Sequence, residues 1–194
     1  MNTDDITIKS EPLVTILIQI FNRKDLLRKA IESAINQTYK NIEIFIADNH
    51  SEDGTEGMVI DYCKNELRIK YHRHEQNIGM IKNAEYSMRR SQGDYLVHLN
   101  DDDWLDLDYV EHSVKFLEQN PDYAFVSPQT RLYSREDSSA EPRLMYAPKL
   151  DDEKVISRLK KYVASQDTGM ISSGCFRASI IRDCLMADNF TYKK

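Results

Sequence analysis

The sequence lacks the features that mark several large classes of protein. No apolar run approaches the roughly 18 residues that a membrane-spanning helix requires. The N-terminal stretch MNTDDITIKSEP is too polar and acidic for a secretory signal peptide. Cys63, Cys175 and Cys184 form no CxxC or zinc-like spacing, which fits a reducing compartment. We therefore expect a cytoplasmic protein, with work at the inner face of a membrane left open.

The sequence also has fewer basic than acidic residues. The chain has 26 Lys and Arg against 32 Asp and Glu, which gives a formal net charge of −6. Non-specific binding to nucleic acid depends on a basic face, so nucleic acid is not expected as a partner. An anionic ligand such as a nucleotide would need local help from a cation, a helix N-terminus or a few well-placed basic side chains.

A chain of 194 residues suits one domain rather than two, and it contains no internal repeat. Short β-branched runs alternate with amphipathic segments, which predicts a doubly wound, mostly parallel α/β sheet flanked by helices. Ligands of such sheets bind beyond the carboxyl ends of the strands, here the loops at 21–23, 48–54 and 100–104. The expected strands are 13–20, 42–47, 67–74, 95–99 and 123–127, and the expected helices lie within 24–36, 55–65, 77–93 and 107–119.

The stretch YLVHLNDDDWLD (95–106) sets three carboxylates directly after a buried strand. Asp101, Asp102 and Asp103 offer hard oxygen ligands of the kind that Mg²⁺ and Mn²⁺ prefer. If the segment stays extended, Asn100 and Asp102 face one ligand while Asp101 and Asp103 face elsewhere. A capping cluster for the next helix is the plainer alternative. The position after a buried strand favours the cation site.

Two further polar groups are expected at the same edge of the sheet. Asp48 and Asn49 follow the second strand, where such residues also serve as ordinary turn formers. The segment NIGMIKNA (77–84) opens the third helix and includes Lys82, which would suit an anion but is equally a common way to start a helix. Neither group is specific by itself.

In combination these segments resemble the family 2 glycosyltransferases of the GT-A fold. The resemblance covers residues 12–127 and rests on PLVTILIQIFNRKDLLRKAIESAINQTYKNIEIFIADNHSEDGT, NIGMIKNA and GDYLVHLNDDDWL, in that order. It implies a Rossmann-like fold and transfer of a sugar, with inversion, from a nucleotide-diphospho-sugar donor to a saccharide or lipid-linked acceptor. It also implies Mn²⁺ or Mg²⁺ as cofactor, and polysaccharide or glycoconjugate biosynthesis as the setting.

The resemblance also assigns roles to individual residues. Asp102 matches the metal ligand, while Asp103 and Trp104 match positions that hold the turn and shape the sugar pocket. Asn49 departs from the family, which usually has a second aspartate there to receive the uracil imide proton. An amide both accepts and donates without charge, so uracil, thymine and guanine all stay open. The expected donor-binding residues are Gln19, Ile20, Phe21, Asn22, Asp48, Asn49, Lys82, Asn100 and Asp101.

The general base is the missing role. In the family it is an acidic residue near an ED-like motif that follows the acceptor-side segment. Residues 169–181 resemble the start of that segment, but no ED follows before Lys194. We therefore expect the base beyond Lys194, with Asp167 and Asp188 as weaker candidates. The alternative function is a nucleotide-sugar-binding fragment or interaction module without turnover.

Beyond residue 127 the pattern loosens. We expect a long loop or flap over 128–150, a helix over 151–164, and a short strand or turn leading into a helix over 172–185. The expected divisions are an extended or disordered N-terminus (1–11), the nucleotide-sugar-binding half (12–127) and an incomplete acceptor-side region (128–194).

Three other interpretations are less favoured. His72 and His74 share one face of a strand, which suggests zinc, but no third ligand has suitable spacing. A phosphatase of the haloacid dehalogenase type has its nucleophile after the first strand, where this chain has QIFNR. A sugar nucleotidyltransferase would have a glycine-rich basic loop there.

Overall fold

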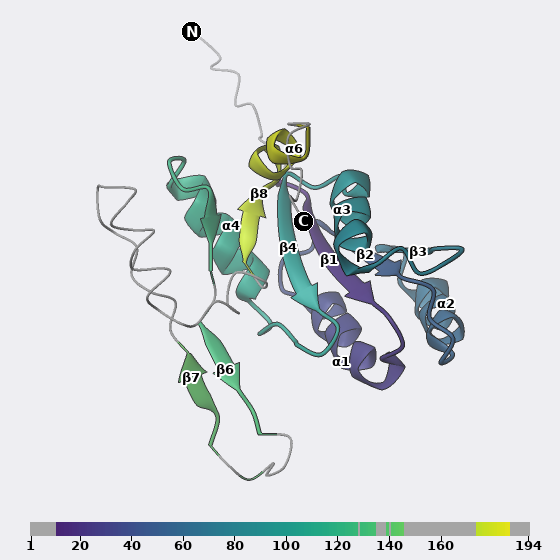
Figure 1. The fold of residues 1–194 in the computed structure, drawn as a ribbon. Helices are drawn as coiled ribbons and strands as arrows, with labels where there is room; N and C mark the ends of the chain where they lie inside the picture. Colours follow the sequence, from purple (N-terminus) through teal and green to yellow (C-terminus); the bar gives the residue numbers. More distant parts are fainter. Residues whose placement is uncertain (1–10, 128, 135–138, 140, 146–173, 187–194) are drawn as a thin grey trace, which may run out of the picture.

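A computed structural model describes residues 11–127, 129–134, 139, 141–145 and 174–186. Within them a six-stranded sheet has the order β3-β2-β1-β4-β8-β5 (Figure 1). The first four strands run parallel, and β8 runs antiparallel to its neighbours β4 and β5. The predicted α/β class with a mostly parallel sheet is confirmed. The strands are β1 (Val14–Ile20), β2 (Ile42–Asp48), β3 (Ile69–Arg73), β4 (Tyr95–Asn100), β5 (Phe125–Val126) and β8 (Cys175–Arg177).

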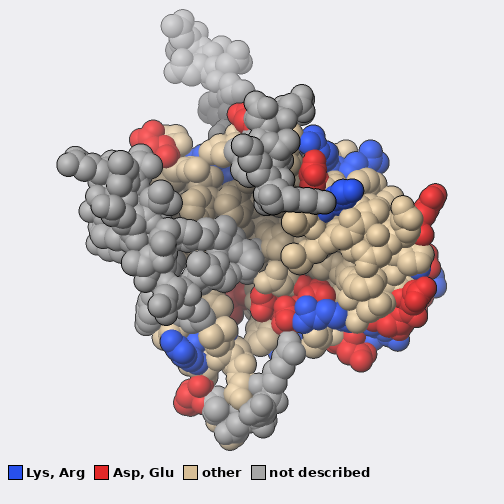
Figure 2. Space-filling model, viewed as in Figure 1, with Lys and Arg blue, Asp and Glu red and all other residues tan. Residues whose placement is uncertain are grey.

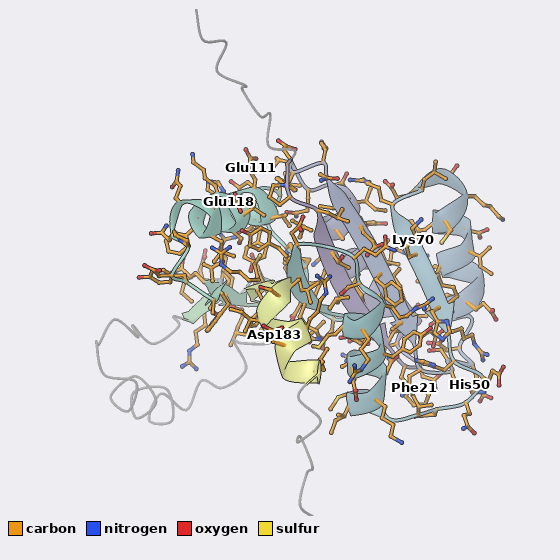
Figure 3. All side chains as sticks on the ribbon, turned by 90° about the horizontal axis from the view of Figure 1, so that it is seen from above. Phe21, His50, Lys70, Glu111, Glu118 and Asp183 are labelled. Carbon is orange, nitrogen blue, oxygen red and sulfur yellow. The ribbon has the colours of Figure 1, made fainter. Side chains whose placement is uncertain are left out.

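Helices cover both faces of this sheet, as a doubly wound arrangement requires. One face packs against α1 (Lys24–Ile35), α2 (Thr55–Asn65) and α4 (Tyr109–Gln119), and the other against α3 (Met80–Arg90) and α6 (Ala178–Met186). Figure 3, an end-on view, shows α4 with Glu111 and Glu118 on one side of the sheet and α6 with Asp183 on the other.

The central strands are buried on both faces, which is why their sequences are almost continuously apolar. All seven residues of β2 are buried, and β1 is buried except at Gln19. The register pairs Ile20 with Asp48 and Gln19 with Asn100, so β1, β2 and β4 end at one level. That shared end is the edge at which the polar loops begin.

Two regions differ from expectation. The segment expected as a loop or flap contains a two-stranded antiparallel hairpin, β6 (Thr130–Leu132) and β7 (Arg143–Met145). Figure 1 shows it apart from the main sheet, on the side to which β4 points. The strand β8 lies between β4 and β5 in the sheet, although it comes after both of them in the chain. The sequence patterns do not predict this order. The helix expected over 151–164 lies outside the described residues.

No helix in the described ranges combines the length and apolar character needed to cross a bilayer.

Candidate functional site at the carboxyl ends of the strands

Loops that follow three neighbouring strands meet at one edge of the sheet. The loop after β1 is joined to the loop after β2 because Asn22 N donates to Ser51 Oγ (2.9 Å) and Asn22 Oδ1 accepts from Glu52 N (2.8 Å). Asn22 and His50 have left-handed φ values of 52° and 71°. Such values are uncommon outside glycine and often mark functional loops. Figure 3 shows Phe21 and His50 on the same side of the molecule.

The acidic triplet is the most charged part of this edge. Arg23, in the loop after β1, places one guanidinium across two of its carboxylates. Nη1 lies 2.8 Å from Asp101 Oδ1, and Nη2 lies 2.5 Å from Asp102 Oδ2. Figure 2 shows basic and acidic side chains adjoining at the edge below β4. An opposite charge therefore balances part of the repulsion within the triplet.

The predicted pairing within the triplet is wrong. Asn100 Nδ2 donates to Asp103 Oδ2 (2.7 Å), while Asp101 and Asp102 share Arg23. The reason is local: residues 101–102 form a turn, so the alternation of an extended strand stops at Asn100. Asp102 is thereby grouped with Asp101 rather than with Asn100.

Asp101 is the most buried member of the triplet, with 7% of its surface exposed. Burial disfavours the charged form and raises its pKa to about 6, a rise that the charges of Asp102 and Asp103 reinforce and that Arg23 partly opposes. A positive charge beside a buried carboxylate stabilises its ionised form, which is the role that Arg23 has here.

Asp48, after β2, is held differently. It is fully buried; its Oδ1 accepts from Ser51 N (2.7 Å) and its Oδ2 from the Tyr71 hydroxyl (2.6 Å). Asn49 is 4% exposed and joins this edge to the start of α3: Nδ2 donates to Asn77 Oδ1 (2.9 Å), and Oδ1 accepts from Ile78 N (2.9 Å). Both side chains have hydrogen-bond partners within the protein.

The face of α3 toward the sheet carries buried polar side chains beside the partly buried Tyr86 and Met88. Gln19 Nε2 donates to Ser87 Oγ (2.8 Å), and Asn83 Nδ2 donates to the carbonyl of Ala47 (2.9 Å). Since the Asn83 amide nitrogen is the donor there, its Oδ1 accepts from His74 Nε2 (3.0 Å). This leaves His74 Nδ1 as acceptor for His72 Nε2 at 3.3 Å. The two histidines therefore support α3 through Asn83.

The predicted donor-binding residues do not all present side chains at this edge. Ile20 is 2% exposed in the core, and only its carbonyl takes part, as acceptor for Asn49 N (2.9 Å). Phe21 and Lys82 are exposed. Our sequence interpretation missed Arg23 and Tyr71. A basic residue in the loop after the first strand, opposite an acidic loop, was the available signal for Arg23.

Asp101 and Asp102 are the carboxylates at this edge that would hold a divalent cation. Among the residues that the structure describes, no three His, Cys, Asp or Glu side chains converge as a self-sufficient metal site. Asp101 and Asp102 do converge, and a guanidinium already lies between them. Mg²⁺ and Mn²⁺ typically take one or two carboxylates from the protein and complete their shell with phosphate oxygens and water. Asp101 and Asp102 together fit a site of this kind, in which the protein supplies two carboxylates and the ligand supplies phosphate oxygens.

A small cavity adjoins this edge, and a larger groove runs along the helices that follow β1 and β2. A cavity of about 110 Å³ adjoins the triplet between Asp103, Trp104 and the β6 strand, with Tyr133 packed on Trp104 at a ring distance of 5.1 Å. A larger groove of about 680 Å³ lies between α1 and α2 and includes no residue of the triplet. Of these two, the smaller cavity is the one that adjoins the acidic triplet.

Acidic and amide side chains at the carboxyl ends of parallel strands define a doubly wound α/β protein whose polar edge is the one at which such folds bind ligands. Residues 15–181 match the family described as Glycosyl transferase family 2. The chain belongs to that family. Putative glycosyltransferase EpsH of Bacillus subtilis is 30% identical over 105 residues, which are 54% of this chain and 30% of EpsH. The chain thus spans less than a third of that relative.

Solved structures support the GT-A fold. S. aureus TarS 1–349 in complex with UDP-GlcNAc superposes with a TM-score of 0.69 at 13% identity, covering 88% of this chain and 47% of TarS. The mannosyltransferase PcManGT from Pyrobaculum calidifontis, in complex with GDP-Man and Mn²⁺, has a TM-score of 0.57 at 21% identity, covering 67% of this chain and 38% of PcManGT. At these identities the likeness concerns the fold alone.

Proposed function

We propose that this chain belongs to an inverting glycosyltransferase that uses a nucleotide-diphospho-sugar, with residues 12–127 as its donor-binding half. The observation that carries the proposal is the position of the acidic pair Asp101 and Asp102 at the end of β4, beside the ends of β1 and β2, in a member of family 2. The structural neighbours contain UDP-GlcNAc and GDP-Man, so uracil and guanine nucleotides are the first to test.

The ends of β1 and β2 would receive the nucleoside. Gln19 and Asp48 are positioned by Ser87 and Tyr71, which limits the number of rotamers that binding must freeze. Asn49 uses both ends of its amide on the loop at 77–78, and its oxygen keeps one lone pair for a donor on the base. Its first role is thus to hold the loop, and base selection is shared with the backbone around it.

The acidic pair would receive Mn²⁺ or Mg²⁺, with Asp102 as the direct ligand and Asp101 supporting it or the ribose. A bound divalent cation supplies stabilisation of the negative charge that develops on the departing diphosphate. Asp103 is held by Asn100, which fixes the turn that presents Asp102. The cavity beside Asp103 and Trp104 would take the donor sugar.

The acceptor hydroxyl, of a saccharide or a lipid-linked sugar, would attack the anomeric carbon from the face opposite the diphosphate. Its proton needs a carboxylate base, for which Asp167 and Asp188 are weak candidates and a residue after Lys194 a stronger one. Both candidates lie outside the described residues. The alternative function, binding without turnover, corresponds to the case in which that base is not in this chain.

Calorimetric titration with UDP, GDP and dTDP, with and without Mn²⁺, tests the proposal. We expect one nucleotide to bind on the order of 100-fold more tightly with Mn²⁺ in the wild-type protein, because the cation neutralises the diphosphate. In Asp102→Ala this gain should disappear. Asp61→Ala is the matched control, since Asp61 is an exposed aspartate on α2 that pairs with Lys64.

A gain from Mn²⁺ that survives in Asp102→Ala would contradict the site. Hydrolysis of UDP-GlcNAc and GDP-Man by the same samples separates the two functions: turnover supports the transferase, and Mn²⁺-dependent binding without turnover supports the donor-binding fragment.

A further inference from the structure

Arg23 lies between the two carboxylates of the site, and the proposed function assigns it no role. The guanidinium of Arg23 spans Asp101 and Asp102 from 78 and 79 residues earlier in the chain. Each of its two terminal nitrogens donates to a different carboxylate, at 2.8 and 2.5 Å. The planar fork of arginine makes such paired, charge-assisted hydrogen bonds better than lysine does. Arg23 thus lies where the proposed function needs a divalent cation.

Local helix formation does not explain an arginine at this position. Arg23 is the N-cap of α1, where Ser, Thr, Asp and Asn are preferred and where the helix end repels a positive charge. The cap is supplied from another loop, because Asp53 Oδ2 accepts from Lys24 N at 2.8 Å. The contacts that favour Arg23 here are those with the acidic pair.

The backbone of Arg23 is fixed while its side chain is not enclosed. Its carbonyl accepts from Leu26 N (3.0 Å) and Leu27 N (3.2 Å), and the preceding residue Asn22 is tied to Ser51. The Arg23 side chain is 40% exposed, against 9% for Asp101 and 29% for Asp102. The guanidinium can therefore leave by side-chain rotation alone, with the main chain of the site unchanged.

We infer that Arg23 is an internal counter-ion that holds the acidic pair until the divalent cation and the nucleoside diphosphate arrive together. A cation arriving alone must displace a positive charge that is attached to the chain and leave it without a partner. A cation arriving with a diphosphate brings new negative oxygens for the displaced guanidinium. Arg23 thus makes cation binding depend on the nucleotide. This inference rests on the proposed function and specifies the order in which its ligands bind.

Manganese binding, read by the electron paramagnetic resonance signal of free Mn²⁺, tests the inference without any assay of activity. Wild type and Arg23→Gln are titrated with MnCl₂ alone, and again with excess UDP and excess GDP. We expect Arg23→Gln to bind Mn²⁺ alone about tenfold more tightly than wild type, since a competing cation is gone. With nucleotide the two proteins should differ by less than about threefold, so the coupling between Mn²⁺ and nucleotide shrinks.

Arg28→Gln is the matched control. Arg28 lies exposed on α1, so its substitution removes the same charge at a distance from the triplet. Its manganese affinity should equal that of wild type. Arg23→Lys keeps the charge but loses the paired hydrogen bonds of the guanidinium, so we expect a manganese affinity between those of wild type and Arg23→Gln. If Arg23→Gln does not fold, the affinity of Arg23→Lys tests the inference in its place.

Two results would overturn the inference, and they differ. If Arg23→Gln and Arg23→Lys bind Mn²⁺ alone no more tightly than wild type, while wild type binds it with nucleotide, only the role of Arg23 is refuted. If wild type binds no Mn²⁺ even with UDP or GDP, the proposed function is refuted and the role of Arg23 with it.

Discussion

The ends of β2 and β4 lie at the same edge of one sheet, yet their acidic residues are in opposite conditions. Asp48 is fully buried and both of its oxygens are bonded to fixed donors, Ser51 N and the Tyr71 hydroxyl. Asp102 is partly exposed, and so is the side chain of Arg23, to which it is bonded. The first carboxylate is enclosed by the fold, whereas the second is bonded to an exposed side chain. Stability and ligand binding should therefore separate between the two positions.

The largest effect on stability is expected at Asp48. Asp48→Ala leaves the Tyr71 hydroxyl and the Ser51 amide without their acceptor in a buried place, which costs about 3 kcal/mol of unfolding free energy. Urea denaturation without metal or nucleotide measures it. Asp61→Ala, on the exposed face of α2, should change stability by less than about 0.5 kcal/mol. A small effect at Asp48 would remove the distinction between the two ends.

Removing only the donor should cost less. Tyr71→Phe keeps the ring and deletes the hydroxyl that donates to Asp48, so we expect a loss of about 1.5 kcal/mol in the same urea experiment at pH 7. A loss equal to that of Asp48→Ala would mean that Tyr71 supplies the whole contribution and the Ser51 amide none.

The same pair predicts a dependence on alkaline pH. Burial, and then the hydrogen bond and charge of Asp48, raise the pKa of Tyr71 above its ordinary value near 10. A group whose pKa is higher in the folded than in the unfolded state contributes its full stabilisation below the unfolded pKa. That stabilisation is lost as the pH rises from the unfolded pKa through the folded pKa. The difference in unfolding free energy between wild type and Tyr71→Phe should therefore shrink above about pH 10. A constant difference up to pH 11, about one unit beyond that value, would contradict the assignment.

A smaller effect is expected where the network reaches α3. Ser87→Ala removes the acceptor of Gln19 Nε2, which is only part-buried and can turn to water, so we expect about 0.5–1 kcal/mol. Thermal unfolding measures it, and Ser33→Ala, which removes an acceptor for Leu105 N on the opposite face, gives a comparison of similar size.

The smallest effect on stability is expected at Asp102. Asp102→Ala loses one bond to Arg23 but also relieves repulsion from Asp101, so unfolding free energy should change by less than about 0.5 kcal/mol. Urea denaturation without metal gives the value. Combined with the loss of manganese-dependent binding expected above, this completes the contrast with Asp48. A loss of several kcal/mol would place Asp102 among the structural residues.

Much of the sheet was predictable because its signals are local. The apolar runs of β1 and β2 and the periodicity of α1 identify those elements without reference to their partners. Two features depend on distant partners instead. A short strand or turn and a helix were expected over 172–185 and are present as β8 and α6, but the place of β8 between β4 and β5 had no local signal. The contact of Arg23 with Asp101 joins residues 78 positions apart.

The third helix shows a different limit. Ile81, Ala84 and Met88 share one face by spacing, but Ile81 is 58% exposed and the buried residues are Asn83 and Ser87. Polar side chains are buried there because Ala47 and Gln19 offer them partners. Apolar spacing therefore found Met88, which packs on the sheet, but it did not find the buried positions Asn83 and Ser87.

The late position of β8 in the chain has a consequence for synthesis. Until residues 175–177 have left the ribosome, β4 has one edge without a hydrogen-bonded neighbour and β5 has no strand to join. A nascent chain that stalls before that point displays an open strand edge, the surface through which partly made sheets adhere to one another. Chaperone capture and inclusion-body formation should therefore fall sharply once residues 175–177 have left the ribosome and joined the sheet.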